Sequence, residues 1–231
     1  MTAYAPTIAA TDAGTREAAA GRGRTMIIGA TLAVAAAIVA AVLAFRPWPA
    51  RNTFDYELLA PIRDSIWTAI VVDALASAAI AITLSLATCL FAQGRGGRIA
   101  VIGTFVTTVG GLLFAMGSFG FAGFTWYVTD PVLPAADGAR LLDYAVANPD
   151  HLMLVSMLGF LVYTLGTLVL AAALFRSGAV PKSLPIALIA GTVAQFGFSD
   201  RALDIVQIVL MGVLVVVGLL LMRRPVLGPR P

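Results

Sequence analysis

Long apolar runs recur along this chain and set the strongest limit on how it folds. Six of them fill most of the sequence between residues 25 and 224, and they cover residues 26–45, 67–92, 99–124, 152–175, 184–198 and 203–222. A helix rises about 1.5 Å per residue, so about 20 apolar residues cross the hydrocarbon core of a bilayer, which is about 30 Å thick. We therefore expect an all-α, polytopic membrane protein with six transmembrane helices.

The low charge of the chain supports this fold class. Only 12% of its 231 residues are charged, 60% are hydrophobic, and the mean hydropathy is +0.94. Soluble domains carry roughly 25% charged residues, so a chain this apolar needs the lipid bilayer as its main partner. Six crossings leave no room for a separate soluble domain. We divide the chain into a flexible tail (1–24), a membrane domain (25–224) and a short tail (225–231).

The first apolar run also fits a second interpretation. Arg16, Arg22 and Arg24 precede it, as basic residues precede the apolar core of a secretory signal peptide. Such a core has about 7–15 residues, whereas the run at 26–45 has 20. We therefore predict an uncleaved first crossing.

Basic residues divide unevenly between the two sides that six crossings define. The side with both termini and the turns at 93–98 and 176–183 carries ten of them, and the other side carries five. Arginine and lysine are enriched in cytoplasmic segments, so we expect both termini in the cytoplasm. Abundant alanine and arginine are typical of GC-rich bacterial genomes, which favours a bacterial plasma membrane. Because the basic residues are scattered among loop ends, the sequence does not favour binding of nucleic acid.

One carboxylate, Asp73, is set well inside an apolar run, the one at 67–92. A helical projection puts it on a face roughly 140° wide together with four hydroxyl side chains. These are Ser65, Ser77, Thr83 and Thr88. A polar stripe on an oily helix favours contact with protein over contact with lipid. We expect Asp73 to lie in the outer third of the membrane.

This carboxylate is the best candidate for a ligand or ion site. Three polar residues near the outer ends of the last two runs are its expected companions: Gln195, Asp204 and Gln207. Ionisable groups inside a membrane often mark ion or substrate pathways. The alternative is a structural carboxylate that pairs with Arg201 or Arg63, or that accepts a hydrogen bond from Ser77.

Glycines repeat at intervals of seven residues in two of the runs. Gly103, Gly110 and Gly117 lie in the third run, and Gly159 and Gly166, followed by Ala173, lie in the fourth. Small residues at a helical repeat let backbones approach closely in lipid. We expect these glycines to be helix-packing residues that bring the third and fourth helices together.

No residue pattern in the sequence indicates catalysis. There is no metalloprotease motif, no nucleotide-binding loop and no pair of cysteines with metal-ligand spacing. His151 is the only histidine, and Cys89 is the only cysteine. Gly117 and Ser118 lack the spacing of an intramembrane serine protease. We predict no enzymatic activity, no catalytic residues, no metal and no cofactor.

The stretch LVYTLGTLVLAAALFRSGAVPKSLPIALIAG, residues 161–191, carries a resemblance. It is similar to six-pass, alanine-rich bacterial integral membrane proteins that are grouped in uncharacterised families. The resemblance implies a six-pass topology. Such families have no agreed catalytic residues, so it implies no site residues.

Two classes of function remain open. The first is a non-enzymatic accessory, subunit or sensor protein, which implies other membrane subunits or a homo-oligomer as partners. The second is a small-solute or ion transporter with Asp73 as its coupling group. Carriers often have broken helices at matching places in their two halves. Pro185 has no counterpart in the run at 67–92, and we therefore favour the first class on sequence alone.

Overall fold

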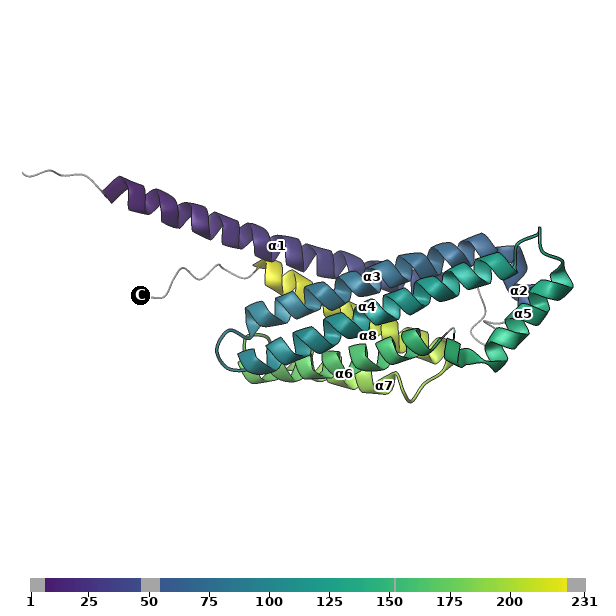
Figure 1. Cartoon of the computed structure of the whole chain (residues 1–231). Coiled ribbons are helices and arrows are strands. Elements are labelled where there is room, and N and C mark those ends of the chain that lie inside the picture. The colour runs from purple at the N-terminus through teal and green to yellow at the C-terminus, as the bar shows by residue number, and fades with distance from the viewer. Residues whose placement is uncertain (1–6, 47–54, 152, 224–231) are drawn as a thin grey trace, which may run out of the picture.

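The computed structural model describes residues 7–46, 55–151 and 153–223, and it confirms the all-α fold class over this part of the chain (Figure 1). The elements within these ranges are α1 (Thr7–Phe45), α2 (Tyr56–Leu59), η1 (Ala60–Ile62), α3 (Arg63–Phe91), α4 (Gly97–Val128), α5 (Ala135–Ala147), η2 (Pro149–His151), α6 (Leu154–Ser177), α7 (Ser183–Ala194) and α8 (Asp200–Arg223).

Five helical segments in the described residues are long and apolar enough to cross a membrane. They are Ala20–Phe45, Tyr56–Phe91, Gly97–Val128, Leu154–Ser177 and Asp200–Arg223. This agrees with a polytopic membrane protein. The fifth of the six predicted crossings, 184–198, differs from a full membrane-spanning helix, because α7 has only 12 residues. At about 1.5 Å per residue it is about 18 Å long, roughly half a bilayer core.

The early end of α7 has a local cause. The N–H groups of Phe196 and Gly197 donate to the carbonyls of Val193 and Ala194, three residues back, at 3.1 and 3.0 Å. Bonds of this type tighten and close a last helical turn. Glycine just past a helix end is a common stop signal. The chain then follows a non-helical path to the start of α8.

The first helix is longer than the sequence predicts. We expected a flexible tail over residues 1–24, but α1 begins at Thr7. Residues 7–24 are rich in alanine, the best helix former, and contain no proline after Pro6. Residues 1–6 and the tail predicted at 225–231 lie outside the described residues.

The six predicted membrane segments pack as a closed ring. In order around it, α3 contacts α4, α4 contacts α6, α6 contacts α7, α7 contacts α8, α8 contacts α1, and α1 contacts α3. One buried apolar cluster joins α1, α3, α6, α7 and α8 inside the ring. Five of the six segments therefore share a common apolar interior, and α4 packs against it through α3 and α6.

Helices α1 and α8 run antiparallel. Gly29 and Gly218 face each other so closely that a Cβ on either would meet the backbone carbonyl of the other. At the opposite end of the pair, Arg46 at the end of α1 lies 2.8 Å from the Asp204 carboxylate in the first turns of α8. The first and last described helices thus have their outer termini at the same end of the bundle (Figure 1).

The predicted packing glycines lie between α4 and α6. A Cβ added to Gly103, Gly110 or Gly117 would overlap Leu170, the Tyr163 backbone or the Ser156 backbone, respectively. From the other side, a Cβ on Gly159 or Gly166 would overlap the backbone of Phe114 or Thr107. Each glycine therefore admits a residue of the facing helix, and the two backbones are in direct contact.

A polar clamp holds the far end of the bundle, where α3 and α4 meet the loop before α5. The Arg63 guanidinium donates to the Asp130 carboxylate at 2.9 Å and lies 4.3 Å over the Trp126 ring. The Trp126 indole N–H donates to Asp64 at 2.8 Å. The N–H of Val132 also donates to Asp130, at 2.9 Å. Charge-assisted bonds of this kind fix the loop on the helix ends.

The glycine contact predicts a sharp difference between two alanine substitutions in α4. Gly110→Ala should lower the melting temperature of the protein in detergent, because its Cβ meets the Tyr163 backbone; overpacking typically costs about 1–3 kcal/mol. Gly120→Ala is the matched control, since nothing lies within 4 Å of its added Cβ. Equal melting temperatures for the two variants would contradict the close contact.

The clamp predicts a pH-dependent contribution of Asp130. Two hydrogen bonds hold the pKa of this carboxyl below its usual value: the bond from the Val132 N–H has the larger effect, and the bond from the Arg63 guanidinium the smaller. A carboxylate whose pKa is lowered by folding stabilises the fold fully at pH values above its unfolded-state pKa of about 4. This stabilisation is lost as the pH falls through the lowered pKa of the folded state. Asp130→Asn should therefore lower the melting temperature at neutral pH, with the difference vanishing in acid. A difference that stays constant down to strong acid, or an equal one for the exposed Asp143→Asn, would refute this role.

Candidate ligand-binding cavity

A cavity of about 140 Å³ lies inside the ring of helices. Its walls come from α1, α3, α4, α6, α7 and α8, so each predicted membrane segment contributes at least one side chain. The lining residues of α3, α4, α6 and α8 lie away from both ends of their helices. Such a position suits a binding site inside the membrane, where many carriers hold their substrates.

One wall of the cavity is apolar. It consists of Val39, Leu43, Ile80, Leu188, Leu210, Met211 and Leu214. The rest of the lining is polar or aromatic, and this part holds Asp73, Ser77, Phe114, Phe160, Tyr163, Thr164, Thr167, Thr192, Gln195 and Gln207. Mostly apolar walls with a few placed polar groups are typical of small-molecule sites.

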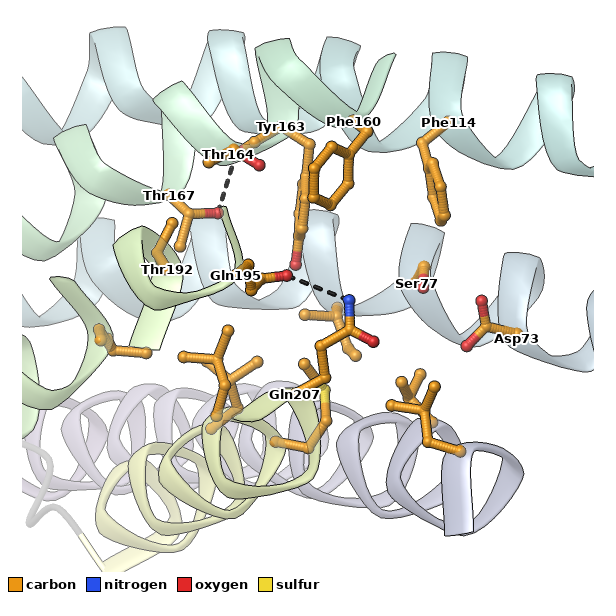
Figure 2. A pocket seen from close by; sticks show the side chains of 17 residues that line it. Asp73, Ser77, Phe114, Phe160, Tyr163, Thr164, Thr167, Thr192, Gln195 and Gln207 are labelled. Atoms are coloured by element: carbon orange, nitrogen blue, oxygen red, sulfur yellow. Dashed lines mark hydrogen bonds between the residues drawn. The ribbon is translucent and has the colours of Figure 1, made fainter. Parts of the chain in front are cut away.

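Three of the four predicted site residues line this cavity together (Figure 2). Asp73 comes from α3, Gln195 follows the last turn of α7, and Gln207 comes from α8. The Gln207 amide donates to the Gln195 side-chain oxygen at 3.2 Å. This bond ties the end of the short helix to α8 beside the cavity.

Asp204, the fourth candidate, lies elsewhere. Its side chain is buried, and its carboxylate contacts Arg46 at 2.8 Å and Arg201 at 3.5 Å. Asp204 is three residues before Gln207, so it shares that side of α8 but lies about 4.5 Å nearer the start of the helix, where Arg46 and Arg201 reach it. The structure therefore gives Asp204 a place in an ion-pair network that joins α1 to α8.

The Asp73 carboxylate has no protein partner among the side chains that the structure describes, those of residues 20–46, 55–151 and 153–223. Both arginines that the sequence offered as partners are engaged elsewhere, Arg63 with Asp130 and Arg201 with Asp204. Ser77 lies one turn away but makes no hydrogen bond to it in this part of the chain. Asp73 also lies deeper along its helix than we expected, because α3 begins at Arg63 and not at Trp67.

Two buried hydroxyls in the wall also lack partners within the described residues. The side-chain oxygens of Thr164 and Thr192 are inaccessible and accept or donate no hydrogen bond there. By contrast, Thr167 donates to the Tyr163 carbonyl at 2.9 Å. Buried polar groups are normally paired, so unpaired ones around a cavity indicate that water or a ligand completes their bonding.

The polar stripe predicted on α3 turns inward only in part. Asp73 and Ser77 reach the cavity, whereas Thr83 is buried and donates to the Ala79 carbonyl at 2.6 Å. Thr88 is buried, and Ser65 is exposed at the far end of the helix. Two members of the stripe thus contribute to the candidate site.

Sequence reasoning missed the aromatic part of the site. Phe114, Phe160 and Tyr163 point into the cavity from the side of α4 and α6 (Figure 2). The sequence does not reveal whether a phenylalanine in an apolar run faces lipid or the protein interior. The sequence offers one indirect signal, because Phe160 directly follows Gly159, a member of the predicted packing repeat. In the structure Gly159 packs against Phe114, so the two rings lie at one helix contact.

Comparisons of the chain with protein-family models, with curated proteins and with solved structures found no match. The candidate site is therefore supported by its own geometry.

The unpartnered state of Asp73 predicts how its removal affects stability. Asp73→Asn should leave the melting temperature unchanged or raise it, because it removes a charge that has no counter-charge nearby. Asp204→Asn is the contrasting variant and should lower the melting temperature, since breaking a buried pair typically costs about 3–5 kcal/mol. A fall of similar size for both variants would identify Asp73 as a structural carboxylate.

Proposed function

We propose that this protein is a carrier that binds a small polar solute or cation in the central cavity and moves it across the bacterial plasma membrane, with Asp73 as the coupling group. The chain makes six crossings in this proposal, and both termini are cytoplasmic. The fifth crossing combines the half-length helix α7 with the non-helical residues 195–199. The proposal includes no catalytic step.

The observation that carries the proposal is an unpartnered carboxylate in a cavity lined by side chains from all six segments. An uncompensated charge inside a membrane protein is unfavourable and usually persists for a function. A structural role would require a partner, and the arginines available for it are bound to other acids. On this ground we favour a transporter over an accessory, subunit or sensor protein, which is the reverse of the order that the sequence alone favours.

The short helix α7 gives independent support. Carriers commonly build their sites from discontinuous helices whose ends meet substrate near the middle of the membrane. The last residues of α7, including Thr192, line the cavity, and Gln195 follows directly. A helix C-terminus carries partial negative charge, which favours a cation nearby.

An accessory, subunit or sensor protein is the alternative. Its simplest form is a sensor that binds the same solute without moving it, alone or with other subunits. Binding by itself does not distinguish a sensor from a carrier. Uptake of the bound solute into liposomes that contain the purified protein does, because only a carrier accumulates it.

Native mass spectrometry of the full chain, extracted together with its lipids, tests the proposal. We expect a small bound species on the wild-type protein that is lost in Asp73→Asn and retained in the exposed control Asp143→Asn. The retained species, once identified, is the substrate for the liposome assay. A wild-type protein that carries no small molecule, or an Asp73→Asn variant that keeps it, would overturn the assignment of this cavity.

A further inference from the structure

We propose that the ligand of the cavity is a small organic ammonium compound, held between Asp73 and an aromatic wall formed by Phe114, Phe160 and Tyr163. This inference rests on the proposed function and adds the chemical class of the ligand. It follows from the charge, the aromatic groups, the volume and the layout of the site.

The aromatic wall has the composition that an organic cation needs. The ring centroids of Phe114 and Phe160 are 6.2 Å apart, and the rings are tilted by 53°. Figure 2 shows both rings and the Tyr163 ring directed into the cavity from one side, with Gln207 reaching in from the opposite side. The faces of aromatic rings attract cations, and such cages recognise quaternary ammonium groups.

A single carboxylate suits a ligand of one positive charge. Among the described residues, no three His, Cys, Asp or Glu side chains lie close enough to hold a metal ion. Ca²⁺ and Mg²⁺ prefer six or more oxygen ligands, often several of them carboxylates or waters. The apolar wall and the rings offer no such ligands but suit the alkyl groups of an ammonium compound.

The cavity volume limits the size of the ligand. An engineered protein cavity of about 150 Å³ accommodates benzene, a molecule of six heavy atoms. The cavity here is about 140 Å³. The cavity therefore suits a ligand of roughly six or seven heavy atoms, such as an ammonium group with a short polar arm.

The polar groups divide between two ends of the cavity. Asp73 and Ser77 lie at one end in Figure 2, and Thr164, Thr167 and Thr192 lie at the other. The Thr164 and Thr192 hydroxyls have no partner within the described residues. A ligand with its positive group at Asp73 and a hydroxyl or similar group toward the threonines matches this division. Its bonding to Thr164 and Thr192 requires their side chains to rotate toward the cavity, because their oxygens are inaccessible in this structure.

Calorimetry with the full chain in lipid nanodiscs tests this inference. The probe is choline, and the uncharged analogue is 3,3-dimethyl-1-butanol, in which a carbon atom replaces the charged nitrogen. We expect choline to bind at least tenfold more tightly than the analogue, and Asp73→Asn to remove that preference. Phe160→Leu, and separately Phe114→Leu, should weaken choline binding about fivefold to thirtyfold, the range of a partly or fully desolvated cation–π contact.

Phe105→Leu is the matched control, because Phe105 lies on α4 but is 71% exposed on the outside of the bundle. It should leave choline binding unchanged. Melting temperatures of all variants confirm that they are folded.

Equal binding of choline and its analogue, or competition by sodium at the same concentration, would overturn the ammonium assignment while leaving a ligand in the cavity. The same holds if choline fails to bind but mass spectrometry finds a retained small molecule of another class. Absence of any bound species in both experiments would overturn the proposed function as well.

Discussion

Direct backbone contact between α4 and α6 is the interaction on which the rest of the structure depends. Lipid offers no hydrophobic drive for helices to associate, so close packing of small residues has to supply the attraction. Five glycines provide it along these two helices. The same contact sets the candidate site, because Gly159 packs against Phe114 and Gly110 packs against Tyr163. The glycines thus determine which aromatic rings share the cavity.

Much of this architecture could be predicted from the sequence. The apolar runs located the membrane segments, and the seven-residue repeat identified the glycines that the structure places between α4 and α6. The grouping of Asp73, Gln195 and Gln207 also followed from depth along the helices. These features are periodic or rare, and periodicity and rarity are what a single sequence displays.

The remaining features depend on contacts between segments far apart in the sequence. The sequence groups Asp204 with Asp73 because of its depth near the outer end of its run, but its pairing with Arg46 depends on the antiparallel packing of α1 against α8. The early end of α7 is set by two local hydrogen bonds inside an apolar run, and the hydrophobic pattern of that run does not predict a helix end there. The aromatic wall is hidden among many phenylalanines because burial in lipid and burial in protein favour the same residue types.

The short length of α7 affects how a ligand enters and leaves the cavity. A short segment buries less surface against its neighbours than a long one, and α7 makes the smallest contacts in the ring. Separating it from α6 or α8 is therefore the least costly way to break the enclosure. If the protein is a carrier as proposed, opening of the ring at α7 is the expected route for the ligand, and it requires the Gln195–Gln207 hydrogen bond to break.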